Sequence, residues 1–199
     1  MHRWAVLASV PIGVVLVALA DGTRTRLVVA VFSIGSTIML GASALVHLKD
    51  WSVEQVELMV RLDHSAIFIM FATSSTPVAL LVLDAPQSGW MLGIAWVGAL
   101  IGIGAEWTPV HPPAGVMNAA YLVLGWSMLA FIPWMIRALS MPQIVLLLAG
   151  GAAYTVGAIV VGARWPDPWS STFGYHEIWH VFVVVAVACH TVLVASLAW

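Results

Sequence analysis

Long apolar stretches alternate with short polar ones along the whole chain. Seven of the apolar stretches approach or exceed the roughly 20 residues that a membrane-spanning helix needs. They lie at residues 4–20, 26–47, 63–83, 89–105, 115–136, 142–162 and 174–198. The connections carry the Pro, Gly, Asp and Ser residues typical of turns. The pattern predicts an all-α integral membrane protein, with residues 1–199 folded as a single bundle of seven transmembrane helices.

The first apolar stretch has the length of a signal peptide, but no Ala-x-Ala-like site precedes the turn that begins at Asp21. Because six comparable stretches follow, we expect residues 4–20 to be a retained first span.

Local sequence features add detail to this bundle. The longest polar stretch, residues 49–61, spaces its valines as an amphipathic interfacial helix would, although a solvated linker is an equal alternative. Gly98 and Gly102 form a small-x-x-x-small pair suited to close helix contact. Pro77 and Pro133 are expected to kink their helices.

The composition supports a membrane location and excludes some partners. Of the 199 residues, 62% are hydrophobic and only 8% are charged, with a net charge of −2. No basic run is present, so we expect membrane lipids rather than nucleic acid as partners. Cys189 is the single cysteine, which excludes an internal disulfide.

Tryptophans and basic residues bear on the placement in the bilayer. Tryptophans concentrate at the segment ends, as in an interfacial aromatic belt. They are Trp4, Trp51, Trp90, Trp107, Trp165, Trp169 and Trp199. With a cytoplasmic N-terminus, four basic residues face the cytoplasm and three face outward, a margin that decides little. The inner four are Arg3, Lys49, Arg61 and Arg164, and the outer three are Arg24, Arg26 and Arg137.

The last apolar stretch opens with the motif H-E-x-x-H, which runs from His176 through Glu177 to His180. Residues four apart on a helix lie about 6 Å apart along the axis and roughly 40° apart around it. The two imidazoles therefore share a helix face and could bind one zinc ion at about 2.0 Å.

The alternation of spans places more residues beside this motif. With seven alternating spans, the end of the second, the start of the third and the start of the seventh lie at one membrane face. His47 and Asp63 then lie at the level of His176 and His180. Three neutral imidazoles with an open fourth position are typical of a catalytic zinc site. The sequence predicts His47, His176 and His180 as ligands.

Two further residues could support this zinc. Asp63 could orient the attacking water or accept its proton. Ser43 lies one turn before His47 and could donate a hydrogen bond to the site, although a serine in a membrane helix more often bonds its own backbone.

Other interpretations of these residues stay open. A buried histidine is often simply hydrogen-bonded to a neighbour, and Asp63 could pair with Arg61 instead. Glu177 could be the general base of a metalloprotease, as in other H-E-x-x-H proteins. We expect His64, which points about 100° away from Asp63, and His111, in a Pro-rich loop, to be structural or solvated.

Taken together, the motifs resemble the hemolysin III family, within the progestin and adipoQ receptor superfamily. They are Ser43-Ala-Leu-Val-His47, Arg61-Leu-Asp-His-Ser-Ala-Ile67 with Thr76-Pro77, Tyr121 with Gly125-Trp126, Gly150-Gly-Ala-Ala-Tyr-Thr-Val-Gly157, and His176-Glu-Ile-Trp-His180 with His190. Val46 departs from the family, where a Tyr is usual, and so does Ala72-Thr-Ser-Ser-Thr76, where a Gly and a Tyr are common.

The resemblance implies a seven-helix protein of the bacterial cytoplasmic (inner) membrane with a cytoplasmic N-terminus. It also implies a zinc near the cytoplasmic face, held by His47, His176 and His180, with Asp63 as the acid linked to it through water. The superfamily resemblance suggests ceramidase-like hydrolysis of lipid amides, and the family name reflects cell lysis.

We therefore expect a zinc-dependent hydrolase of lipid amides, or a lipid- or membrane-homeostasis protein derived from one. The alternatives are an intramembrane metalloprotease, a non-enzymatic receptor with a structural zinc, and a pore-forming protein. For the last, no span shows the polar stripe that would line an aqueous channel.

Overall fold

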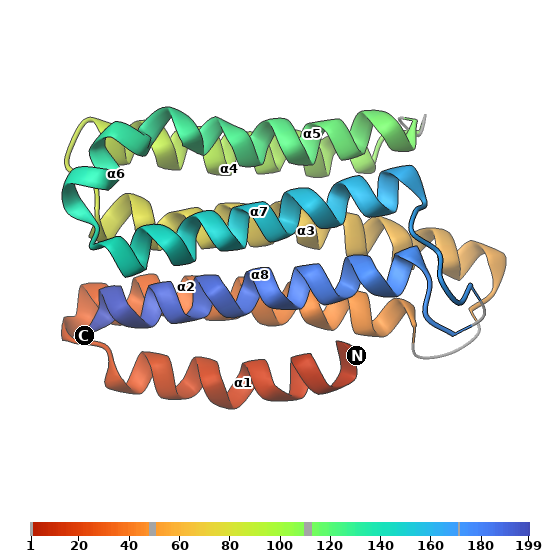
Figure 1. Ribbon diagram of the computed structural model, residues 1–199, viewed down its shortest axis with the longest axis horizontal. Helices are drawn as coiled ribbons and strands as arrows, with labels where there is room; N and C mark the ends of the chain where they lie inside the picture. Colours follow the sequence, from red (N-terminus) through yellow and green to blue (C-terminus); the bar gives the residue numbers. More distant parts are fainter. Residues whose placement is uncertain (1, 48–50, 110–112, 171) are drawn as a thin grey trace.

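The computed structural model describes residues 2–47, 51–109, 113–170 and 172–199, which fold into helices joined by short loops (Figure 1). Lys49 and His111 lie outside the described residues. The elements are α1 (His2–Leu19), α2 (Gly22–Val46), α3 (Val53–Leu81), α4 (Gln87–Glu106), α5 (Ala114–Ser127), the 3₁₀ helix η1 (Met128–Phe131), α6 (Ile132–Ala138), α7 (Met141–Ala163) and α8 (Tyr175–Ala198).

Six helical segments of the described chain are long and apolar enough to cross a membrane. They are Gly22–Val46, Val53–Leu81, Gln87–Glu106, Gly115–Ala138, Met141–Ala163 and Tyr175–Ala198. The first predicted span is the shorter apolar helix Trp4–Leu19. The expected all-helical bundle is thus confirmed, with six candidate membrane spans, and a seventh span at residues 4–20 stays a prediction.

The helices run alternately up and down the bundle, with α1 at one edge against α2 and α8 (Figure 1). Buried apolar side chains of α1, α2, α3 and α8 form the largest core cluster, in which Phe32 and Val29 are almost fully enclosed. The Ser9 and Thr37 hydroxyls, 3.1 Å apart, add a polar link between α1 and α2.

Glycines let α4 approach its neighbours closely. A Cβ atom at Gly98 would collide with the Leu124 side chain of α5, and one at Gly102 would collide with the Phe68 ring of α3. The predicted close-contact role of this pair is confirmed, and both contacts are within the chain.

The helices around the two prolines expected to cause kinks differ in continuity. At Pro133 the helix is interrupted, because α5 passes into the 3₁₀ turn of η1 before α6 begins with the proline in its first turn. Helix α3, in contrast, continues through Pro77 to Leu81, and the kink predicted at Pro77 stays a prediction.

The polar stretch before the third span is helical from Val53 onward and continues directly into α3. Ser52 and Gln55 cap this end reciprocally, since each side chain accepts a hydrogen bond from the other residue's backbone N–H. The stretch is therefore an extension of the spanning helix rather than a linker or a separate interfacial helix.

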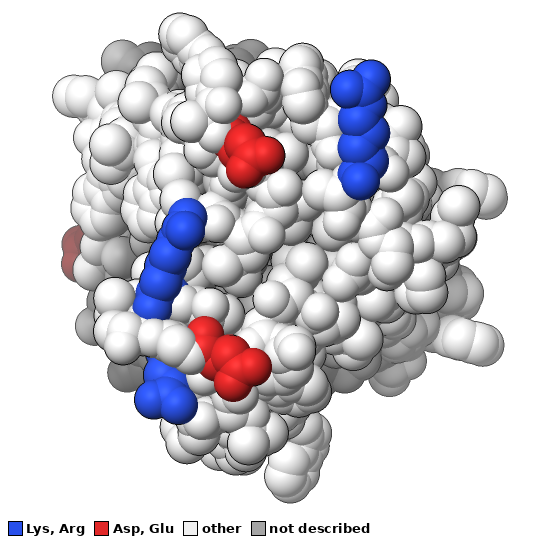
Figure 2. Space-filling model, turned by 90° about the vertical axis from the view of Figure 1, so that its left-hand side faces the viewer, with Lys and Arg blue, Asp and Glu red and all other residues white. Residues whose placement is uncertain are grey.

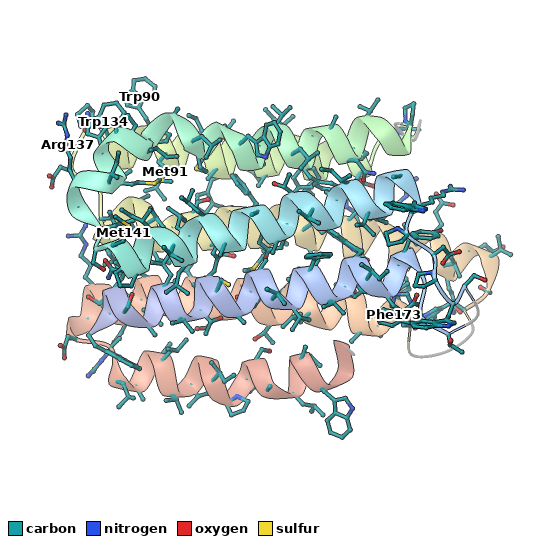
Figure 3. All side chains as sticks on the ribbon, in the orientation of Figure 1. Trp90, Met91, Trp134, Arg137, Met141 and Phe173 are labelled. Atoms are coloured by element: carbon teal, nitrogen blue, oxygen red, sulfur yellow. The ribbon has the colours of Figure 1, made fainter. Side chains whose placement is uncertain are left out.

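The two ends of the bundle differ in chemistry. The end of α2 and the starts of α3 and α8 lie together at the right-hand end of Figure 1. At the opposite end, basic and acidic side chains are scattered singly among uncharged ones (Figure 2). Exposed Trp90 and Trp134 lie there (Figure 3), as expected of an interfacial aromatic belt.

Candidate metal centre

Three histidines from two helices meet at the right-hand end of the bundle. His47 is the residue that ends α2, while His176 and His180 lie in the first two turns of α8. One ring nitrogen from each lies within 4.8 Å of the others, a grouping that could hold a metal ion. His47 is exposed, His176 is partly buried and His180 is buried, so the group is open on one side.

The spacing of the imidazoles fits tetrahedral coordination. The Nε2 atoms of His47 and His176 lie 3.4 Å apart. Two nitrogens about 2.0–2.1 Å from one tetrahedral ion would be separated by about 3.3–3.4 Å. The His47 ring centroid lies 5.3 Å from both other rings, and those two are 4.5 Å apart. A donor set of three imidazoles suits zinc, copper, iron or nickel.

Trp51 fixes the end of α2 that carries His47. Its indole N–H lies 3.2 Å from the carbonyl oxygens of both Leu45 and Val46. These carbonyls belong to the last helical turn, where helical partners are missing. Trp51, expected only as part of an aromatic belt, therefore also caps the helix beside a candidate ligand.

Close packing against α7 fixes the helix that carries the other two histidines. A Cβ atom at Gly157 would lie only 2.7 Å from the Trp179 ring, and one at Gly150 would collide with the His190 ring. The two glycines make room for large side chains of α8, which lets the helices approach closely. Trp179 lies between the two candidate histidine ligands in sequence. Its contact with Gly157 therefore fixes the orientation of α8 about its own axis.

Glu177 caps the start of α8. Its Oε2 accepts a hydrogen bond of 2.8 Å from the backbone N–H of Gly174. Asp167 adds a second carboxylate, which accepts a bond of 3.3 Å from the Tyr175 N–H. These carboxylates at the helix N-terminus also complement its dipole. Glu177 thus has a structural role, and general-base chemistry by Glu177 stays a prediction.

Asp63 and Ser43 lie on the helices that border the three histidines. Asp63, which lies on α3 just after the polar extension, is partly buried. Ser43 is buried on α2, one turn before His47. The predicted roles of Asp63 toward water and of Ser43 toward the ligands stay predictions.

Arg61 is bonded to groups other than Asp63. Its guanidinium lies 2.8 Å from the Glu57 carboxylate, and Nη1 donates to the backbone carbonyls of Glu106 and Thr108. It thereby ties the start of α3 to the end of α4, and the alternative pairing with Asp63 gains no support.

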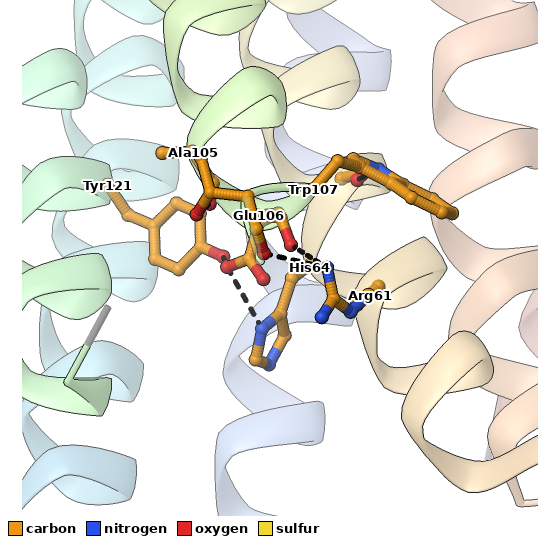
Figure 4. A network of polar contacts seen from close by, with 8 residues as sticks. Arg61, His64, Ala105, Glu106, Trp107 and Tyr121 are labelled. Atoms are coloured by element: carbon orange, nitrogen blue, oxygen red, sulfur yellow. Dashed lines mark hydrogen bonds and ion pairs between the residues drawn. The ribbon is translucent and has the colours of Figure 1, made fainter. Parts of the chain in front are cut away.

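A polar network that the sequence pattern did not predict lies on the neighbouring face of α3 (Figure 4). The buried Glu106 carboxylate lies 3.1 Å from Nδ1 of His64 and 3.4 Å from the Tyr121 hydroxyl. His64 was expected to be structural or solvated, and this hydrogen bond agrees with the structural alternative. Span alternation could have located Glu106, because the end of the fourth span lies at the same membrane face as Asp63.

Comparison with known proteins places the chain in a family. Residues 1–191 match the family model described as "Haemolysin-III related". The chain belongs to this family. It is 30% identical over 187 residues to Hemolysin-3 of Bacillus cereus, which covers 92% of this chain and 82% of that protein. It is also 30% identical over 186 residues to the Hemolysin-3 homolog of Bacillus subtilis (strain 168), covering 92% and 84% of the two chains.

The family match spans the whole site, from His47 to His180, and the helices of the Glu106 network. The resemblance found in the sequence motifs is thereby confirmed at the level of the family. Together with six apolar helices it makes the chain an integral membrane protein of the haemolysin-III-related family.

Proposed function

We propose that this protein is a zinc-dependent hydrolase that cleaves lipid amides at one face of the bacterial inner membrane. The observation that carries the proposal is the convergence of His47, His176 and His180 within 4.8 Å of one another at the end of an apolar bundle. The spacing and chemistry of these three donors favour zinc, which accepts three imidazoles and keeps a fourth position for catalysis.

Each residue then has a defined task. His47, His176 and His180 would hold the ion, which when bound lowers the pKa of a water molecule toward about 7. Asp63, on the helix α3 that packs against α2, would accept the proton of the attacking water. Ser43 would orient His47 from the preceding turn of α2.

The location of the site favours a lipid substrate. The ligands lie where apolar helices end, which is the depth of the polar linkage between a lipid headgroup and its acyl chain. An amide at this linkage could reach the site while its chain remains among the apolar helices. We place the N-terminus, which lies at the same end of the bundle as the three histidines, on the cytoplasmic side (Figure 1).

The test compares two carboxyl-to-amide variants on the same substrates. Purified protein in lipid nanodiscs is loaded with zinc and given a panel of N-acyl lipids, and fatty acid release is measured before and after chelation. We expect chelation and Asp63→Asn to abolish release. Glu177→Gln should retain it, because an amide oxygen can still accept the Gly174 N–H bond.

Other outcomes would favour different functions. Loss of activity in Glu177→Gln with normal Asp63→Asn would favour a metalloprotease-like use of the motif. A protein that binds zinc but releases no fatty acid would favour a receptor or membrane-homeostasis role in which the ion joins α2 to α8. The first outcome would contradict the role given to Asp63, and the second would contradict the proposed lipid amide hydrolysis itself.

A further inference from the structure

The Glu106 carboxylate is buried where a charge must be neutralised. Its side chain is only 6% exposed, whereas the side chain of its partner His64 is 40% exposed. An isolated carboxylate at such a position is costly, and it is retained either protonated or beside a cation. The 3.1 Å separation of Nδ1 and Oε1 allows one proton to neutralise the pair, carried by either residue.

Neighbouring groups hold this pair in place. The Tyr121 hydroxyl donates to the same Glu106 oxygen, and the Tyr121 ring lies 4.6 Å from that of Phe68, one turn after His64. Arg61 donates to the backbone carbonyl of Glu106 at 2.8 Å, which holds the end of α4 against α3 (Figure 4).

The pair also adjoins the proposed catalytic acid. Asp63 directly precedes His64 on α3, so the proposed catalytic acid and the more exposed member of the pair are neighbours on one helix. Helix α3 packs against α2, which ends at His47, and against α4, which carries Glu106. The exposed part of His64 reaches the surface of the protein, and its Nδ1 atom faces Glu106.

We propose that His64 and Glu106 form a proton-transfer pair that carries protons between Asp63 and the surface of the protein. The inference rests on the proposed lipid amide hydrolysis and assigns it two further residues. His64 and Glu106 act through Asp63 and are positioning residues rather than groups that touch the scissile bond.

The proton balance of amide hydrolysis gives the pair its task. The water oxygen bonds to the carbonyl carbon as one water proton passes to Asp63, and the carbon–nitrogen bond breaks as that proton moves to the leaving nitrogen. The resulting carboxylic acid then ionises. Its proton returns through Asp63 to the pair and leaves from the exposed edge of His64, and the released amine is protonated in water.

The test uses paired variants of the zinc-loaded protein in nanodiscs, assayed on a fluorescent N-acyl lipid amide. We expect His64→Ala and Glu106→Gln each to lower kcat by about 100-fold, the scale of one assisted proton transfer. Zinc content should stay at the wild-type level. The matched controls Ser65→Ala and Glu54→Gln, which alter an adjacent hydroxyl and an exposed carboxylate, should leave kcat unchanged.

Added imidazole separates proton transfer from a structural role. It should restore most of the kcat of His64→Ala, and it should not restore Glu106→Gln, in which His64 still fills the space. A normal kcat in His64→Ala, or a loss that imidazole does not restore, would overturn the proton-transfer pair alone. A wild-type protein that hydrolyses no lipid amide would overturn the proposed hydrolysis and the pair with it.

Discussion

Trp51 gives His47 a fixed place at the end of α2, although it would not touch a metal itself. Its indole N–H lies 3.2 Å from two carbonyls of the last turn. Groups that hold a ligand in place commonly affect metal affinity by about 10- to 100-fold. We expect Trp51→Phe, which removes the N–H and keeps an aromatic ring, to weaken zinc binding about 10-fold in a competition titration with a chelator.

The matched control for this variant is Trp165→Phe. Trp165 is a highly exposed tryptophan in the loop before α8. Its substitution should leave zinc affinity unchanged. Equal affinities for Trp51→Phe and the wild type would show that the cap does not hold His47.

At the residue level, the sequence was sufficient to group the three histidines, but it did not reveal the pairing of His64 with Glu106. The histidines could be grouped from sequence because imidazoles at one membrane level are costly unless a shared ion or a polar partner satisfies their nitrogens. Glu106 was not predicted, because it directly follows the apolar stretch 89–105 and belongs to no recognised motif. Its partner His64 was assessed only by its angle from Asp63 around the helix. That angle does not show which residue of the neighbouring helix α4 contacts His64.

At the scale of elements, the packing of α7 against α8 depends on which face each glycine occupies. Gly150 faces the His190 ring, whereas its neighbour Gly151 has open space around it. We expect Gly150→Ala to lower the free energy of unfolding by about 1–3 kcal/mol through overpacking. Gly151→Ala should be neutral or raise it by up to about 1 kcal/mol, because alanine favours the helix.

Thermal unfolding in detergent, followed by helical circular dichroism, compares the two variants directly. A Gly150→Ala protein as stable as Gly151→Ala would contradict the close approach of the two helices. The sequence contains both glycines side by side, so hydropathy predicts two spans here but cannot assign which glycine faces the partner helix.

Element boundaries were the other part that sequence could not decide. The amphipathic residues before the third span suggested a separate interfacial helix or a linker. The reciprocal cap of Ser52 and Gln55 instead starts one helix that runs through to Leu81. Hydropathy averages over polar residues at a helix end, so it could not show that the polar turns and the apolar span share one axis.

At the scale of the whole molecule, buried apolar side chains fill the bundle. Three clusters occupy the interior among the described residues, and they include Phe32, Phe68, Phe131 and Met135. An aqueous channel would need polar lining residues along its length. We expect vesicles that contain the purified protein to retain a trapped dye as well as empty vesicles do.

Rapid dye release, lost in a denatured sample, would contradict this expectation and favour pore formation. Vesicles with a known pore-forming peptide serve as the positive control. The name Hemolysin-3 belongs to the relatives, and this measurement tests directly whether permeabilisation extends to the present chain.

The alternating direction of successive spans was the sequence feature that predicted the most distant contact. It joins residues separated by 129 positions, and the structure brings His47 and His176 to 3.4 Å. The argument needs only that consecutive spans between the ligands alternate, so it holds with six spans or seven. Hydropathy could not give the ring distances, which depend on the cap at Trp51 and the contact of Trp179 with Gly157.

The central claim is that the three histidines hold zinc, and metal analysis of the purified protein tests it most directly. Inductively coupled plasma mass spectrometry should find about one zinc per chain in the wild type, as a three-histidine site predicts. His180→Ala should lose it while keeping its helical circular dichroism. A wild-type protein that is fully folded and takes up no zinc, even when zinc is supplied, would contradict the account.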